Sequence, residues 1–172
     1  QQNKNTTSDD NFEGTLFDLF PAEDTGDEKN SILASLKNTP HTYKLVETEE
    51  DIYNLVCALK NHQTVCFDTE TTGTNAILAE IVGVSLAVSE GEAFYLPMPP
   101  QRADATRRLK ILSPIFENDK ITKVGQNIKY DITILANYGI EVKGKLFDTM
   151  IAHYILQPEL YHGMDYLAEI YL

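Results

Sequence analysis

Two carboxylates separated by one residue follow an apolar run and predict a site for divalent cations. Asp68 and Glu70 lie directly after the β-rich run at 64–67 and just before the turn at 71–73. Side chains alternate between the two faces of a strand, so both carboxylates would point the same way. Adjacent negative charges repel each other, and a hard cation such as Mg²⁺ or Mn²⁺ removes that repulsion. An exposed acidic turn is the alternative interpretation.

A second polar group occupies the start of a predicted helix near Asn127. Asn127 and Asp131 are four residues apart and would share one helical face. The apolar stripe expected to bury this helix consists of Ile128, Ile132 and Leu135. The polar residues expected to face a cleft are Gln126, Asn127, Tyr130 and Asp131. Structural roles are also open, because Asn127 could cap the helix and Asp131 could interact with its dipole, while the N-terminus could attract phosphate.

The elements that must position these residues predict an α/β domain. Thr48 and Asp51 form a capping box at the start of one helix. The predicted strands are 43–46, 64–68, 81–88, 93–97, 123–125 and 145–148. The predicted helices are 48–61, 104–117 with Pro114 as a kink, 127–138, 149–156 and a last one from 165. An antiparallel hairpin followed by alternating strands and helices predicts a ribonuclease H-like mixed β-sheet with parallel strands as well, flanked by helices.

Bulk composition limits the classes of function. The 172 residues suffice for one well-buried domain. A net charge of −12 argues against a protein that coats DNA through a basic surface, but it does not exclude an enzyme whose metal ions supply positive charge. Cys57 and Cys66 lack metal-binding spacing and fit a reducing compartment. With no apolar stretch near about 18 residues and no signal peptide, we expect a soluble, cytoplasmic protein without membrane contact.

Residues 1–40 differ from the rest and predict an acidic, largely disordered linker. They contain eight acidic residues and three lysines, and the opening has no apolar periodicity. One apolar island, Leu16–Phe20, interrupts this stretch. It could dock on the domain as a short element, or it could be a linear motif for a partner such as a sliding clamp. We expect the folded domain to span 41–172.

The motifs together resemble a known family. The segment 68–73 and the later Asn127–Asp131 pattern resemble the first two exonuclease motifs of the DEDD (DnaQ-like, ribonuclease H-like) superfamily. The run 123–150 and the segment 164–169 are similar to the proofreading 3′–5′ exonuclease domain of bacterial DNA polymerase I. The resemblance covers 43–172. It implies a bacterial, cytoplasmic enzyme that hydrolyses phosphodiesters at a DNA 3′ end.

The resemblance also implies roles for individual residues. Asp68 would bridge two divalent cations (Mg²⁺ or Mn²⁺), Glu70 would bind the one that activates water, and Asp131 would serve the second. The residues implied to contact the single-stranded 3′ end are Thr71, Thr74, Gln126, Asn127 and Tyr130. Relatives carry a bulky apolar residue near Thr74, where this chain has a threonine. The implied partners are the single-stranded DNA 3′ end and a polymerase domain of the same full-length chain.

The family's third motif, Tyr-x-x-x-Asp, has a textual match at Tyr161–Asp165. This match runs directly into Leu167–Glu169, a segment that precedes the true motif in the family. We therefore interpret Asp165 as a first-turn carboxylate and expect the third motif beyond Leu172. A domain truncated there would bind metal weakly and cut poorly. Two further polar residues are interpreted as structural: Asp148 as an N-cap and His153 as a packed core histidine.

Two alternative functions remain at this point. One is trimming of RNA 3′ ends by an enzyme of the ribonuclease D kind, which shares the motif chemistry. The other is a non-catalytic domain that only braces a polymerase. The presence of all three carboxylates (Asp68, Glu70 and Asp131) argues against the second.

Overall fold

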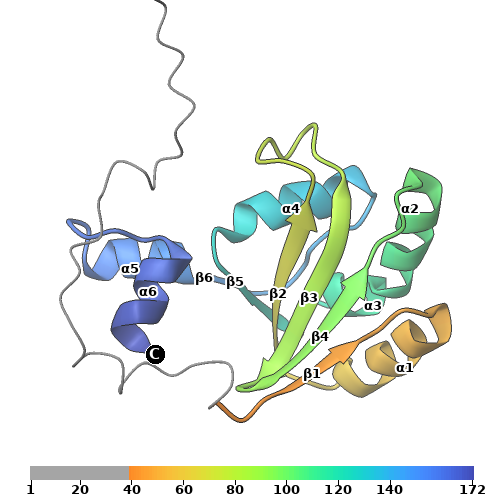
Figure 1. The fold of residues 1–172 in the computed structure, drawn as a ribbon, viewed down its shortest axis with the longest axis horizontal. Helices are drawn as coiled ribbons and strands as arrows, with labels where there is room; N and C mark the ends of the chain where they lie inside the picture. The colour runs from red at the N-terminus through yellow and green to blue at the C-terminus, as the bar shows by residue number, and fades with distance from the viewer. Residues whose placement is uncertain (1–38) are drawn as a thin grey trace, which may run out of the picture. The chain divides into compact units, whose positions relative to one another are not determined.

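A six-stranded mixed sheet forms the centre of the described part of the chain (Figure 1). The computed structural model describes residues 39–172, so the Leu16–Phe20 island lies outside the described residues. The strand order is β1-β4-β3-β2-β5-β6. The strands are β1 (Thr42–Leu45), β2 (Thr64–Thr71), β3 (Ile81–Ser89), β4 (Glu92–Pro97), β5 (Thr122–Gly125) and β6 (Leu146–Asp148). The antiparallel β2–β3–β4 unit is flanked by parallel pairs, β1 with β4 and β5 with β2 and β6, which confirms the predicted mixed sheet.

Within residues 39–172, six helices flank the sheet, four on one face and two near the opposite face at the β5–β6 edge (Figure 1). They are α1 (Glu49–Leu59), α2 (Arg102–Ile111), α3 (Ser113–Phe116), α4 (Ile128–Asn137), α5 (Thr149–Leu156) and α6 (Met164–Tyr171). The predicted capping box of α1 is present, with Asp51 N–H donating to the Thr48 hydroxyl at 3.1 Å. No helix within 39–172 has both the length and the apolar character needed to span a bilayer.

The predicted single helix at 104–117 is two helices. α2 ends at Ile111, and Leu112 serves both as its C-cap and as the N-cap of α3. Pro114 explains the break, because proline has no N–H for the bond that would continue the helix and its ring crowds the preceding turn. The joint is buried all the same, since Leu112, Ile115 and Phe116 are fully inaccessible to solvent.

The hydrophobic core lies between helices α1–α4 and one face of the sheet. Alternate residues of β2 (Val65, Phe67 and Thr69) point into it, as the period of a strand requires. Phe67 packs edge to face against Phe116 with ring centroids 5.1 Å apart. The sheet residues that share this face with them are Val84, Leu86, Phe94 and Leu96. The intervening β2 residues therefore point to the opposite face.

β5 is anchored by a lysine that sequence reasoning did not single out. Lys123 is completely buried, and its ammonium group donates to the backbone carbonyls of Asn118 (2.5 Å), Ile121 (3.0 Å) and Lys143 (2.6 Å). Burial lowers the pKa of Lys123 to about 8, partly opposed by the charge of Asp119. These three bonds tie both chain segments next to β5 to the strand that leads into the site.

Candidate active site

Asp68 and Glu70 lie on the sheet face opposite the core, as their spacing predicted. Asp68 is half-buried and Glu70 is exposed, and they stand opposite Ser85 and Gly83 of β3. β2 runs to Thr71, beyond its predicted end at residue 68, because the segment around Glu70 continues to pair with β3. Regular strand geometry therefore fixes the direction of both carboxylates.

The electrostatics of Asp68 show that several negative charges gather here. The pKa of Asp68 is raised to about 6, first by burial and then by the negative charges of Asp131 and Glu70. Because repulsion of this kind acts over a few ångströms, the three predicted carboxylates belong to one neighbourhood. A cation bound among them would favour the ionised form of Asp68.

Asp131 belongs to this neighbourhood. Contrary to our expectation, it does not face an open cleft. Only 2% of Asp131 is exposed, and its carboxylate accepts hydrogen bonds from the Thr69 N–H (2.9 Å) and hydroxyl (2.6 Å). Burial raises the pKa of Asp131, while the two bonds from Thr69 lower it. The buried residues of α4 are Ile128, Asp131, Ile134 and Leu135. The buried stripe thus runs through position 131, and the predicted stripe member Ile132 is only partly buried.

Asn127 occupies the predicted N-cap position of α4 without performing the predicted bonding. Its backbone is left-handed (φ 55°, ψ 40°), a conformation that asparagine tolerates better than most residues, and its side chain makes no capping bond. Its Oδ1 is buried without a hydrogen-bond partner within residues 39–172. An unpaired buried acceptor is costly, so this atom is a candidate contact for a bound group.

Asp148 caps two helices at once. Its carboxylate accepts from the backbone N–H groups of Asn127 (3.0 Å) and Ile128 (3.0 Å) at the start of α4. It also accepts from Met150 (2.9 Å) and Ile151 (3.3 Å) in α5, which confirms the predicted N-cap. The second role follows from the parallel β5–β6 pairing, which places Asp148 opposite Gly125. These bonds occupy N–H groups at the α4 terminus where we had considered phosphate binding.

Thr71 and Tyr130, both predicted to contact substrate, meet at the end of β2. The Tyr130 and Thr71 hydroxyls are 2.6 Å apart, and Tyr130 also donates to the Gly73 carbonyl at 2.5 Å. This cluster holds the turn after Glu70 against α4. Thr74 lies exposed in the same loop.

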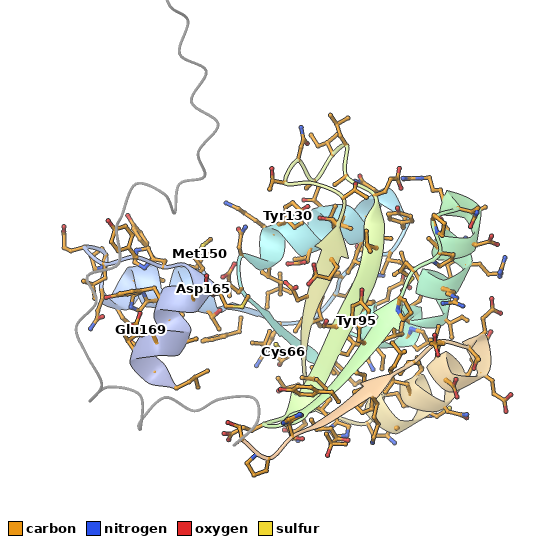
Figure 2. All side chains as sticks on the ribbon, in the orientation of Figure 1. Cys66, Tyr95, Tyr130, Met150, Asp165 and Glu169 are labelled. Atoms are coloured by element: carbon orange, nitrogen blue, oxygen red, sulfur yellow. The ribbon has the colours of Figure 1, made fainter. Side chains whose placement is uncertain are left out.

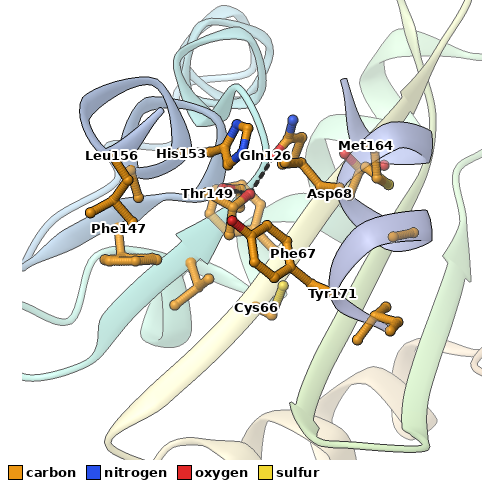
Figure 3. Close-up of a pocket in the computed structure, with 16 residues that line it drawn as sticks. Cys66, Phe67, Asp68, Gln126, Phe147, Thr149, His153, Leu156, Met164 and Tyr171 are labelled. Atoms are coloured by element: carbon orange, nitrogen blue, oxygen red, sulfur yellow. Dashed lines mark hydrogen bonds between the residues drawn. The ribbon is translucent and has the colours of Figure 1, made fainter. Parts of the chain in front are cut away.

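Gln126 is engaged at both ends of its side-chain amide. Its Nε2 donates to the His162 carbonyl at 2.6 Å, and its Oε1 accepts from the Thr149 hydroxyl. Figure 3 shows Gln126 and Thr149 joined in this way beside His153. The amide therefore braces the segment between α5 and α6 in this structure, and a direct contact with substrate would require it to exchange partners.

A pocket of about 460 Å³ lies between helices α5 and α6 and the sheet face opposite the core, the open face of the sheet (Figure 3). Its walls include Cys66, Phe147 and Tyr171, with Asp68 as a charged lining residue. His153 also lines it and is buried, as predicted for a core histidine, with 4% exposed. The sequence did not indicate that His153 Nδ1 lies 2.6 Å from His162 Nδ1.

The chemistry of the carboxylates fits a hard divalent cation, although their side chains do not enclose one. Within residues 39–172, no three side chains of the metal-binding types form a ready-made ligand group. Asp68 and Glu70 nevertheless offer oxygen ligands on an open face, and the raised pKa of Asp68 marks charge that a cation would neutralise. Asp131 adds negative charge from behind β2. Both bonds from Thr69 go to its Oδ1, so Oδ2 is the oxygen that could bind a cation directly.

Comparison with known proteins identifies the family. A family model described as 3′–5′ exonuclease matches residues 43–172. The chain belongs to this 3′–5′ exonuclease family. DNA polymerase I of Pseudomonas aeruginosa is 43% identical over 123 residues, which cover 66% of this chain and 14% of that protein. The chain therefore spans about one seventh of the length of this relative.

Solved structures show the same exonuclease fold. The catalytic core of RRP6 from Trypanosoma brucei superposes with a TM-score of 0.64 at 20% identity, covering 80% of this chain and 36% of that one. NrnC of Brucella melitensis, solved with bound Mg²⁺, superposes with a TM-score of 0.57 at 19% identity, covering 77% and 62%. At such identities the likeness concerns the fold, and it confirms the predicted ribonuclease H-like α/β architecture.

The position of Asp165 in this exonuclease-family chain agrees with a structural role. Asp165 lies exposed in the first turn of α6, whose N-cap is Gly163. Figure 2 labels it on α6, on the far side of the described domain from α1 and α2. Its charge is not among the causes that raise the pKa of Asp68.

Proposed function

We propose that the chain removes nucleotides from DNA 3′ ends by two-metal hydrolysis, as the proofreading domain of a bacterial, cytoplasmic DNA polymerase I. The observation that carries this proposal is that Asp68 and Glu70 lie on the same open face of the sheet, with Asp131 close enough to raise the pKa of Asp68. Membership in the 3′–5′ exonuclease family supports the reaction type. The 43% sequence identity to a DNA polymerase I supports DNA as the substrate and a polymerase domain as the covalent partner.

Asp68 would bridge two divalent cations, Mg²⁺ or Mn²⁺, with Glu70 binding one and Asp131 serving the other. When bound, such cations lower the pKa of a water molecule and neutralise charge on the leaving 3′ oxygen. Asp68 and Glu70 are directed to a common side of β2, so the strand itself sets their spacing. The two Thr69 bonds hold the Asp131 Oδ1 behind the strand, so Asp131 would serve a cation through Oδ2.

The substrate contacts proposed for the 3′ end surround the end of β2. Thr71 and Tyr130 already form one hydroxyl cluster there, and Thr74 lies exposed in the following loop. Asn127 contributes a buried Oδ1 that has no hydrogen-bond partner in the described part of the chain and that a nucleotide hydroxyl or amino group could satisfy. Gln126 would act by holding the segment around His162, unless substrate displaces its present partners. Clamp binding through Leu16–Phe20 stays a separate hypothesis, since that segment lies outside 39–172.

The decisive experiment is digestion of a 5′-labelled, single-stranded DNA in the presence of Mn²⁺. We expect a ladder of products shortened from the 3′ end, faint with this chain and strong with a longer chain that continues into the polymerase. Chelation and Asp68→Asn should abolish it. The matched control is Glu50→Gln, which neutralises an exposed carboxylate in α1 and should cut like the unmodified chain. Asp165→Asn should also retain cutting, because we propose that Asp165 is not the aspartate of the family's third motif.

Two outcomes would contradict the proposal. Faster shortening of an RNA of the same sequence would favour trimming of RNA 3′ ends. Absence of metal-dependent cutting, both in this chain and in a longer chain that continues into the polymerase, would favour a bracing domain.

A further inference from the structure

Tyr95 shares the open sheet face with the two carboxylates of β2. The register pairs Tyr95 with Ser85, Ser85 with Asp68, and Gly83 with Glu70. Directly opposed residues of an antiparallel pair point to the same face, so these side chains form one surface across three strands. Figure 2 labels Tyr95 over this part of the sheet. The residues between Tyr95 and the carboxylates are small, which leaves room for a large ring.

The ring of Tyr95 lies across Gly83. A Cβ atom built on Gly83 would fall 2.2 Å from the Tyr95 hydroxyl oxygen, 2.5 Å from Cζ and 2.6 Å from Cε2. The phenol therefore occupies the space where any other residue at 83 would place its side chain. Gly83 has no unusual backbone angle that would require glycine, so the Tyr95 ring is what requires it.

This placement brings the phenol next to Glu70. Opposed Cβ positions on neighbouring antiparallel strands are about 5 Å apart, and Glu70 is directly opposite Gly83. The Tyr95 hydroxyl lies 2.2 Å from the Cβ position of Gly83, so it is within reach of the Glu70 side chain. Glu70 is exposed, so its carboxylate can meet the phenol directly or through one water molecule.

We propose that Tyr95 is a positioning residue for Glu70. Its O–H donates a hydrogen bond to the Glu70 carboxylate, directly or through one water, and holds that carboxylate in the orientation that binds a divalent cation. The inference rests on the proposed function for the role of Glu70. Gly83 takes part because any larger residue would push the ring away. A tyrosine that merely covers a glycine on a sheet would need its ring only and would not need its hydroxyl.

The test is the affinity of the chain for Mn²⁺, measured by the electron paramagnetic resonance signal of the free ion. Tyr95→Phe keeps the ring and removes the hydroxyl, and we expect Mn²⁺ binding about tenfold weaker, as for other groups that orient a metal ligand. The melting temperature should stay unchanged. Tyr43→Phe is the matched control, because Tyr43 is an exposed tyrosine on β1 whose partner Ala93 shares this face. It should bind Mn²⁺ like the unmodified chain.

A double substitution ties the effect to Glu70. In the Glu70→Gln background, Tyr95→Phe should cause no further loss of Mn²⁺ affinity, because the group that it positions is already altered. Gly83→Ala should weaken Mn²⁺ binding in the same direction by displacing the ring. Equal Mn²⁺ affinity of Tyr95→Phe and the unmodified chain would overturn the inference, as would fully additive losses in the double variant.

The same measurements separate this inference from the proposed function. A chain that binds Mn²⁺ through Glu70 and Tyr95 but never shortens DNA would refute the nuclease and leave the positioning role standing. A chain that shortens DNA, with Tyr95→Phe unchanged in Mn²⁺ affinity, would do the reverse. No Mn²⁺ binding, both by this chain and by a longer chain that continues into the polymerase, would overturn both.

Discussion

The two faces of the central sheet differ sharply although the same strands build both. On the covered face, Phe67, Leu86 and Leu96 have at most 2% of their surface exposed beneath α1–α4. On the open face, Asp68 is half-buried and Glu70 is exposed, and negative charges accumulate. Apolar burial on one face supplies stability, and this lets the other face hold an arrangement that is electrostatically unfavourable without a cation. The proposed metal site and the stabilising core are thus one residue apart along β2.

Neutralising a carboxylate of the open face should have the largest effect on activity. Asp68→Asn removes the ligand that would bridge two cations, which contribute several kcal/mol of transition-state stabilisation, so we expect cutting to fall by about a thousandfold or more. The fold should remain intact. The measurement is the rate of Mn²⁺-dependent DNA shortening together with circular dichroism. Normal cutting by a folded Asp68→Asn chain would show that the open face is not the site.

Shortening an apolar side chain of the covered face should instead act mainly on the stability of the fold. Phe67→Ala empties a fully packed position against Phe116, and we expect a loss of about 3–5 kcal/mol in the free energy of unfolding. Urea unfolding would measure this loss. Cys66→Ala is the matched control, because Cys66 is the preceding residue, is exposed and points to the open face. A similar cost at both positions would remove the distinction between the faces.

Asp148 caps α4 on the covered face and α5 near the open face. Its loss should therefore lower both stability and cutting. Asp148→Ala leaves the first N–H groups of α4 and α5 without their acceptor, and we expect a loss of about 2 kcal/mol for two helix caps. α4 carries Asp131, so cutting should fall as well. Asp148→Asn, which keeps one acceptor oxygen, should lie between Ala and the unmodified chain in urea unfolding. An Asp148→Ala chain of unchanged stability would show that these caps contribute little.

The smallest effect should be a pH dependence caused by the open face. The pKa of Asp68 is about 6 in the folded chain and near 3.8 when unperturbed, so between these values the folded chain binds more protons than the unfolded one. Stability in a chelator should therefore fall as pH rises from about 4 to 6, by about 1 kcal/mol after allowing for solvent screening at this half-buried group. The raised pKa of Asp131 acts in the same direction.

Urea unfolding at several pH values would measure this dependence. Asp68→Asn should flatten it and should be more stable than the unmodified chain at neutral pH. A stability that rises through this interval in the unmodified chain would contradict the charge crowding at the open face.

Local geometry allowed much of the fold to be predicted from the sequence. The Thr48 capping box, the hairpin of β3 and β4, and the common direction of Asp68 and Glu70 each depend on residues close together in the chain. The break at Leu112 was predicted only as a kink at Pro114, because the sequence does not show whether a helix bends or restarts there.

Pairings between distant segments were decided by the tertiary structure. Asp131 turns toward Thr69 because packing of α4 on β2 selects which stripe of the helix is buried, and that stripe includes Ile134 in place of the predicted Ile132. Asp148 reaches α4 because β5 and β6 are parallel neighbours, and Gln126 reaches His162 across the turn before α6.

The sequence by itself therefore determined the common direction of Asp68 and Glu70 and the family to which the chain belongs. Only the tertiary structure decided what surrounds them: Asp131 behind the strand and the Tyr95 ring over Gly83. The physical reason is that strand alternation is a property of consecutive residues, whereas sheet register and helix rotation depend on how the whole core packs.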